Sequence, residues 1–167
     1  MHSKPKKLAF LSMMTAFALV LSYLEALMPP IYAAVPGVKI GLPNIVIIFL
    51  LYRFSLKEAA MVSAVRLLLV ALFFGNAMTL LYSFAGAILS IAVMCLLKLT
   101  KFFSMIGVSI AGGVFHNVGQ IVVAAIVLKT AEIGFYMPVL AVSGTLAGIA
   151  VGLISVLLLK KMEKFKI

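Results

Sequence analysis

Hydrophobic residues fill long runs of this chain, separated by short polar breaks or by stretches rich in Pro and Gly. A helix needs about 20 apolar residues to cross a hydrocarbon core about 30 Å thick. Six runs approach this length, and each is bounded by charged or turn-forming residues. The pattern predicts an all-α integral membrane protein with six transmembrane helices, over residues 8–28, 38–52, 58–75, 77–97, 102–128 and 136–159.

The second run, 38–52, is the least regular of the six. Its first six residues belong to a stretch that holds four Pro and two Gly between residues 29 and 43. Its most apolar part is residues 44–52, and a ten-residue helix that starts at Pro43 would reach only about 15 Å, half of the hydrocarbon core. Two interpretations remain open: a broken half-helix of the kind found at transporter binding sites, and a tilted helix beside a thin patch of bilayer.

Composition and charge exclude several classes of protein. The chain is 65% hydrophobic, its mean hydropathy is +1.29, and 11% of its residues are charged, against about 25% in soluble proteins. Eleven of its fourteen Lys and Arg lie in the two tails, in the turn between the second and third runs, and in the turn between the fourth and fifth runs. Lys39 and Lys129 lie on the opposite side. By the positive-inside rule both termini face the cytoplasm. The net charge of +10 is thus concentrated where the protein meets the surface of the lipid bilayer. We expect no nucleic-acid partner.

The sequence holds few residues of the types that carry out catalysis. The chain contains no Asp, four Glu, one Cys and no Gly-rich phosphate-binding loop of the Walker A type. An Asp-rich Mg²⁺ site, a Cys-based metal cage and an ATP site are therefore excluded. We expect a single membrane domain over residues 1–167 that is not an enzyme and has no metal and no intrinsic cofactor.

Polar residues inside the apolar runs are the candidate binding residues. Arg66 lies at the middle of the third run, where its guanidinium needs an anion. Both Glu25 and a bound ligand remain open as that anion. Three polar residues cluster in the fifth run, and their clustering favours hydrogen bonds to a polar ligand: His116, Asn117 and Gln120.

Three more candidates lie at the outer side. Lys39 and Asn44 flank the Pro- and Gly-rich stretch, and Asn44 stands near a helix start, which favours anions. Asn76 follows Gly75 in a tight turn. The full set of candidate substrate-binding residues is Glu25, Lys39, Asn44, Arg66, Asn76, His116, Asn117 and Gln120.

Small residues mark the faces through which helices approach closely in a membrane. The last run carries one such stripe, which favours ordinary packing within the bundle: Gly144, Gly148 and Gly152. The first run carries two separate small-residue faces, and the face that continues to Glu25 should point inward. The other face is left for an external partner or for a second neighbouring helix: Ala9, Ser12 and Ala16.

Several motifs together resemble a known family. They are Lys39-x-Gly41-x-x-Asn44, the Arg66 run ending at Gly75, Ser83-x-x-Gly86-x-x-x-Ser90 and, most specific, His116-Asn117-x-Gly119-Gln120. They are similar to the Gx transporter family, which is also described as heptaprenyl diphosphate synthase component I. More remotely, the layout resembles the substrate-binding S components of energy-coupling factor (ECF) transporters, which have six helices and cytoplasmic termini.

The two descriptions imply different functions. The S-component resemblance implies uptake of a small vitamin or cofactor, with a flavin (riboflavin, FMN or FAD) as the leading expectation and with the ligand held in the outer half. It also implies that Ala9, Ser12 and Ala16 dock on a membrane scaffold subunit that works with two ATPase subunits. The alternative is a membrane accessory subunit of a polyprenyl diphosphate synthase in quinone synthesis. That role is non-catalytic, because prenyl synthases of the usual kind use Asp-rich motifs.

Overall fold

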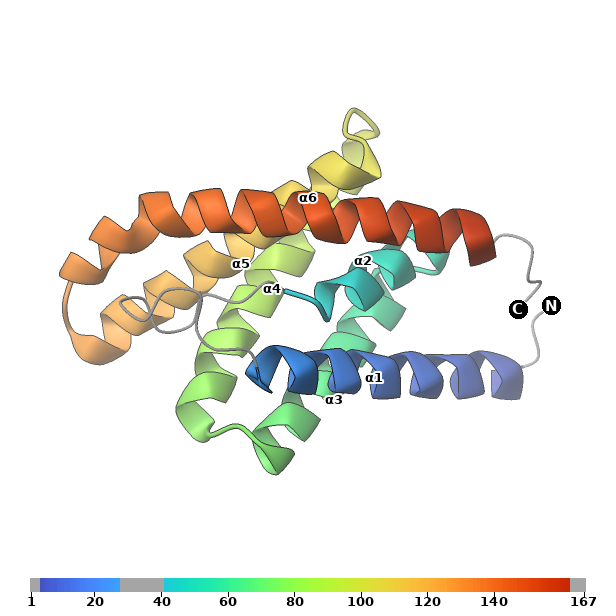
Figure 1. Ribbon diagram of the computed structural model, residues 1–167, viewed down its shortest axis with the longest axis horizontal. Helices are drawn as coiled ribbons and strands as arrows, with labels where there is room; N and C mark the ends of the chain where they lie inside the picture. The colour runs from blue at the N-terminus through green and yellow to red at the C-terminus, as the bar shows by residue number, and fades with distance from the viewer. Residues whose placement is uncertain (1–3, 28–40, 163–167) are drawn as a thin grey trace.

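A computed structural model describes residues 4–27 and 41–162, and every regular element in these ranges is helical (Figure 1). The all-α class predicted from the sequence is confirmed. The elements are α1 (Lys4–Leu27), α2 (Asn44–Arg53), α3 (Leu56–Phe73), α4 (Ala77–Thr100), α5 (Met105–Leu128), a 3-10 helix η1 (Glu132–Tyr136) and α6 (Met137–Met162). Figure 1 shows α1 and α6 extending along the long axis, with α2 between them.

Four segments in the described ranges are long and apolar enough to cross a membrane: Lys4–Leu27, Leu80–Thr100, Met105–Leu128 and Glu132–Met162. The sequence predicts six crossings, and the two others correspond to α2 and α3. α2 has only ten residues. α3 has 18 residues, and three of them are charged: Lys57, Glu58 and Arg66.

The short helix α2 forms the centre of the bundle. Each of its residues from 45 to 51 is at most 5% exposed, so every side of the helix is covered. α1, α3 and α6 all pack against it. A helix that is hydrophobic on all sides is stable only when it is surrounded. The predicted span 38–52 is therefore a central half-length helix from residue 44 onward, and residues 38–40 lie outside the described ranges.

Serine caps fix where two of the helices begin. The Ser55 hydroxyl accepts a hydrogen bond from the backbone N–H of Lys57 (3.2 Å), and the Ser104 hydroxyl accepts one from the N–H of Gly107 (3.2 Å). Such caps satisfy N–H groups that have no partner within the helix. Thus α3 begins two residues before the predicted start, and α5 begins three residues after it.

Glycines allow α5 and α6 to pack backbone against backbone, as the stripe on the last run predicts. A Cβ added to Gly144 would lie 2.9 Å from the carbonyl oxygen of Gly113, and one added to Gly148 would lie 2.5 Å from the Cα of Ile110. A Cβ on Gly152 would approach α5 in the same way. Close approach of this kind drives helix association in a membrane.

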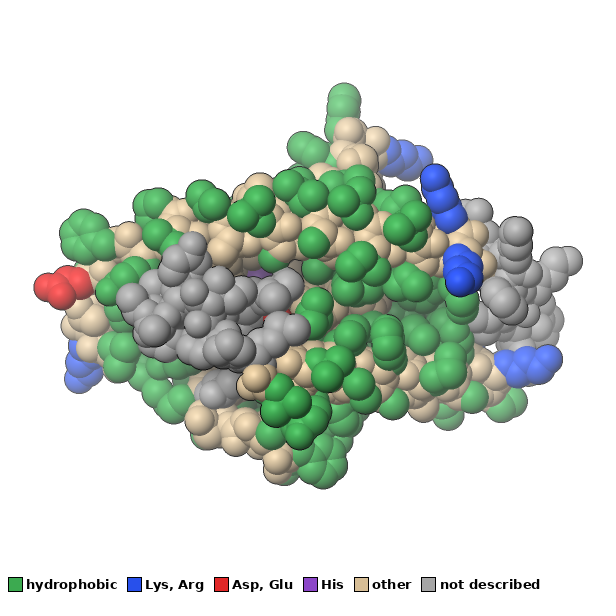
Figure 2. Space-filling model, in the orientation of Figure 1, with side chains coloured by type: hydrophobic (Ala, Val, Ile, Leu, Met, Phe, Trp, Pro, Cys, Tyr) green, Lys and Arg blue, Asp and Glu red, His purple; other side chains and the backbone are tan. Residues whose placement is uncertain are grey.

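Polar contacts join α2 and α3 to the long helices. The Ser155 hydroxyl on α6 donates to the Ile45 carbonyl on α2 (3.2 Å). The Lys7 ammonium on α1 pairs with the carboxylate of Glu58 on α3. The start of α1 and the end of α6 lie at the same end of the molecule (Figure 1), and Figure 2 shows most of the visible Lys and Arg side chains gathered toward that end.

Candidate functional site

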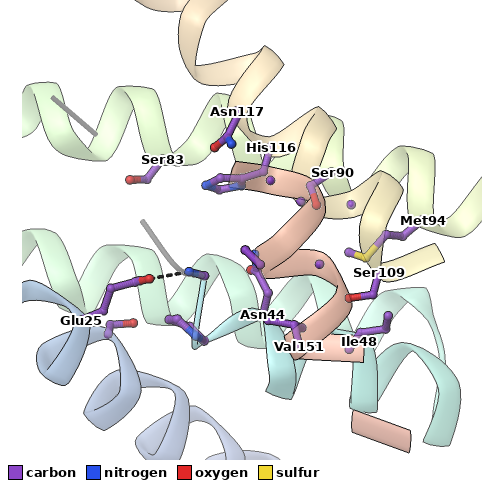
Figure 3. Close-up of a pocket in the computed structure, with 18 of the residues that line it drawn as sticks. Glu25, Asn44, Ile48, Ser83, Ser90, Met94, Ser109, His116, Asn117 and Val151 are labelled. Atoms are coloured by element: carbon purple, nitrogen blue, oxygen red, sulfur yellow. Dashed lines mark hydrogen bonds between the residues drawn. The ribbon is translucent and has the colours of Figure 1, made fainter. Parts of the chain in front are cut away.

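All six α-helices contribute to one polar cavity inside the bundle. Its volume is about 50 Å³, which is room for a few water molecules. Figure 3 shows polar side chains from different helices converging on it. Its polar or charged lining side chains are Ser22, Glu25, Asn44, Arg66, Ser83, Ser90, Ser109, His116 and Asn117.

Arg66 supplies the positive charge of this cavity. Its side chain is 8% exposed, and its Nη1 donates to the Ser22 hydroxyl at 3.3 Å. Its Nε has no hydrogen-bond partner among the described residues. The nearby Glu25 carboxylate attracts the guanidinium electrostatically. Ser22 and Glu25 of α1 thus stabilise part of the Arg66 guanidinium, and its Nε–H remains available to an additional acceptor.

Glu25 links the end of α1 to the segment that leads into α2. Its carboxylate accepts a hydrogen bond from the backbone N–H of Gly41 (Figure 3). Gly41 has a φ of +76°, a left-handed conformation that favours Gly. The carboxylate therefore serves a structural contact as well as facing Arg66.

Asn44 lines the cavity from the first turn of α2. The expectation that this helix start favours an anion depends on free amide groups. The N–H groups of Asn44, Ile45 and Val46 already donate to the carbonyls of the three residues from Gly41 to Pro43. The Asn44 side chain, and not these amides, is therefore the group that α2 offers to a ligand.

His116 and Asn117 line the cavity from α5. Asn117 is 5% exposed, and its Nδ2 donates to the Leu140 carbonyl on α6 at 2.8 Å. His116 lies against Gly86, where an added Cβ would be 3.0 Å from the imidazole Cε1. The absence of a side chain at Gly86 thus makes space for the ring between α4 and α5.

The structure brings together five of the eight predicted binding residues: Glu25, Asn44, Arg66, His116 and Asn117. Gln120 lies one turn further along α5 and packs on Gly86, outside the cavity lining. Asn76 is exposed in the turn before α4. Lys39 falls outside the described residues.

The hydroxyl groups that line the cavity are not among the candidates predicted from the sequence. Ser22, Ser83 and Ser90 fit small-residue packing stripes, and that interpretation hides their polar role. On α5, small or polar residues recur at helical spacing, which places them on one face: Ser109, Gly112, Gly113, His116 and Asn117. That spacing is the signal that would have identified Ser109.

The mixture of charged and polar groups around the cavity is suited to binding a small polar ligand. The cavity holds one guanidinium, one carboxylate, an imidazole and several hydroxyl and amide groups. No group of three or more His, Cys, Asp and Glu in the described ranges could hold a metal ion. Sites for drug-sized ligands enclose about 300–1,000 Å³, several times the volume found here, so the cavity gives no support to the flavin expectation.

The small-residue stripe of α1 lies on the outside of the bundle. Ala9, Ser12 and Ala16 are all exposed, whereas Ala18 and Ser22 of the other face are buried. The helix thus turns one small-residue face toward α3 and the cavity. The other face is uncovered by the described part of the chain.

A family model described as heptaprenyl diphosphate synthase component I matches residues 14–158. The match covers most of the sequence, so the chain belongs to this family. The comparisons with curated proteins and with solved structures found no match.

Proposed function

We propose that this chain is the non-catalytic membrane subunit of a heptaprenyl diphosphate synthase. The family match over residues 14–158 carries this proposal. Helices long enough to cross a membrane support it, and so does a sequence with no Asp. A soluble partner subunit supplies the Asp-rich Mg²⁺ site and the chain elongation, and this chain holds that partner at the membrane.

The proposal includes a topology. All six α-helices form one domain in a bacterial plasma membrane, with α2 and α3 entering beside the four long spans and with both chain ends in the cytoplasm. The start of α1 and the end of α6 lie at one end of the bundle, and eleven of the fourteen Lys and Arg belong to the tails and turns assigned to that side. The basic surface there fits a soluble, acidic partner face.

We propose the Arg66 cavity as a binding site for a small anionic group. The buried guanidinium has one unpaired N–H donor, and the side-chain amide of Asn44 and the ring of His116 line the same cavity. Phosphate and carboxylate groups fit the planar fork of a guanidinium. The diphosphate end of a prenyl substrate is one ligand of this class.

A second candidate function is the substrate-binding subunit of an ECF-type transporter. A polar cavity lined by all six helices favours it, as does the exposed stripe Ala9, Ser12 and Ala16. In this case the stripe docks on a scaffold subunit that works with two ATPases. The ligand is then an anion smaller than a flavin.

Affinity purification from native membranes separates the two functions. The first predicts recovery of a soluble prenyl synthase, together with shorter or less abundant polyprenyl products in a deletion strain. The second predicts recovery of a membrane scaffold with two ATPases, and Ser12→Phe should abolish that recovery while Ala150→Phe, on the exposed face of α6, should not. Recovery of ATPases without a prenyl synthase would refute the first function.

Ligand binding to the cavity is tested on the purified chain. Inorganic diphosphate should raise its melting temperature in detergent, and Arg66→Met should abolish this shift. Lys129→Gln, which removes a cation that does not line the cavity, should leave the shift unchanged. An equal shift in the Arg66→Met variant would show that diphosphate binds elsewhere.

A further inference from the structure

A second hollow lies between α3 and α4 and shares no lining residue with the Arg66 cavity. Its volume is about 360 Å³, within the range of ligand sites. Its lining residues are all apolar except one: Leu56, Ala60, Ser63, Ala64, Leu67, Phe84, Ala87, Ile88, Ile91 and Ala92. We call it the α3–α4 groove.

The groove exists because small side chains face each other where the two helices separate. Figure 1 shows α3 and α4 converging at the turn that joins them and diverging away from it. Ala60 and Ala64 on one wall, with Ala87 and Ala92 on the other, leave the space between the helices unfilled.

The groove opens on an apolar outer surface of the bundle. Phe84 and Ile88 on its rim are 47% and 56% exposed. Leu68, one residue beyond the lining of α3, is 56% exposed. In a membrane, such a surface faces lipid chains, and the groove is a recess in it.

The length of the groove matches one leaflet of a bilayer. Its α3 wall extends from Leu56 to Leu67, a rise of about 16 Å at 1.5 Å per residue. One leaflet contributes about half of a hydrocarbon core about 30 Å thick. The groove therefore has the length of a single acyl chain that starts at the α3 N-terminal side.

Each wall of the groove leads to a cation at that same side. Lys57 precedes Ala60 by three residues and is exposed. Lys98 follows Ile91 by seven residues, so each Lys continues the face of its own wall. The Lys98 ammonium donates to the Leu51 carbonyl and keeps further N–H donors. An apolar slot one leaflet long, ending between two cations, complements a lipid with an anionic head group.

We propose that the α3–α4 groove binds one acyl chain of an anionic glycerophospholipid from the leaflet on the Lys57 side. The phosphate of its head group lies between Lys57 and Lys98. This site is independent of the function proposed above, because it shares no residue with the cavity and requires neither a synthase nor a transporter partner.

Native mass spectrometry of the purified chain in detergent tests the proposal. Titration with phosphatidylglycerol, against phosphatidylcholine carrying the same acyl chains, should give more retained phosphatidylglycerol, by about fivefold for Lys57 and about fivefold again for Lys98, since each Lys near an anionic head group contributes on that scale. Ala64→Phe fills the groove and should remove the retained lipid. Ala150→Phe on exposed α6 is the matched control and should retain it.

A second variant keeps the test informative if the first one does not fold. Lys57→Gln leaves the apolar walls intact and should lower the preference for phosphatidylglycerol by about fivefold, whereas Lys129→Gln should leave the preference unchanged. Equal retention of both lipids by the unaltered chain would overturn the proposal, as would unchanged retention in a folded Ala64→Phe variant. Displacement of the phospholipid by equimolar heptaprenyl diphosphate would also overturn the proposal, and would show that the groove binds an isoprenoid.

Discussion

The contact between α5 and α6 at Gly148 allows a quantitative prediction. In a Gly148→Ala variant, the new methyl group would lie 2.5 Å from the Cα of Ile110, 2.8 Å from the carbonyl oxygen of Ser109 and 2.9 Å from the backbone nitrogen of Ile110. All three are backbone atoms of α5. They cannot rotate away as a flexible side chain would, so the two helices have to separate.

Two opposing effects set the magnitude. Overpacking of a close-packed interior costs about 1–3 kcal/mol, and backbone contacts place this substitution in the upper part of that range. Replacement of Gly by Ala within a helix stabilises by about 1 kcal/mol. Gly148→Ala should therefore lower the free energy of unfolding by about 1–2 kcal/mol.

Unfolding by sodium dodecyl sulfate in mixed micelles, followed by circular dichroism, measures this change. Gly107→Ala is the matched control, because a Cβ there would meet only side chains, at 3.7 Å or more. That variant should be as stable as the unaltered chain or slightly more stable. If Gly148→Ala and Gly107→Ala gave the same free energy of unfolding, the close approach of α5 and α6 would be refuted.

The same unfolding assay checks three further predictions. Ser155→Ala removes a fully buried hydroxyl that donates to α2 and should cost about 0.5–1.5 kcal/mol, the scale of hydrogen bonds between membrane helices; no loss would show that α2 is held by packing alone. Asn117→Ala removes the donor to the Leu140 carbonyl and should cost about 1–2 kcal/mol, because it also leaves a small void; a stabilised variant would contradict this. Glu58→Gln weakens the contact with Lys7 and should cost less than about 1 kcal/mol, since the ammonium is partly exposed; a larger loss would assign the pair a dominant role.

Local patterns account for most of what the sequence predicts about the fold. Long apolar runs bounded by charges identify the elements, because a helix in a membrane has to satisfy its own backbone groups. The glycine stripe likewise predicts that the last helix packs closely against a neighbour, and in the structure this neighbour is α5. The precise starts of α3 and α5 depend on Ser55 and Ser104, two polar residues that a search for apolar runs passes over.

The position of α2 could not be predicted from its own residues. Its length indicates only that it does not cross the core alone. Whether it lies at the surface or at the centre depends on α1, α3 and α6, and one of the contacts that hold it, from Ser155 to the Ile45 carbonyl, joins positions 110 residues apart. Such tertiary contacts leave no local pattern.

For the candidate site too, local spacing predicts part of the arrangement and tertiary contacts decide the rest. Helical spacing places His116 and Gln120 on one face of α5, and the sequence therefore predicts that both bind a ligand. The cavity, however, extends from Asn117 back toward Ser109, and Gln120 lies beyond its end against α4. Spacing along one helix gives a direction around the axis, but the depth of a cavity is set by the neighbouring helices.

The burial of α2 on all sides has a consequence for how the protein is made. A ten-residue helix is about 15 Å long, so if it entered a bilayer alone, unpaired backbone groups at its ends would lie in hydrocarbon. It can be accommodated only after flanking segments have created a protein-lined place for it. Biogenesis of this protein therefore requires α2 to enter the membrane together with its neighbours, and a nascent chain halted just after residue 53 should leave that segment outside the lipid.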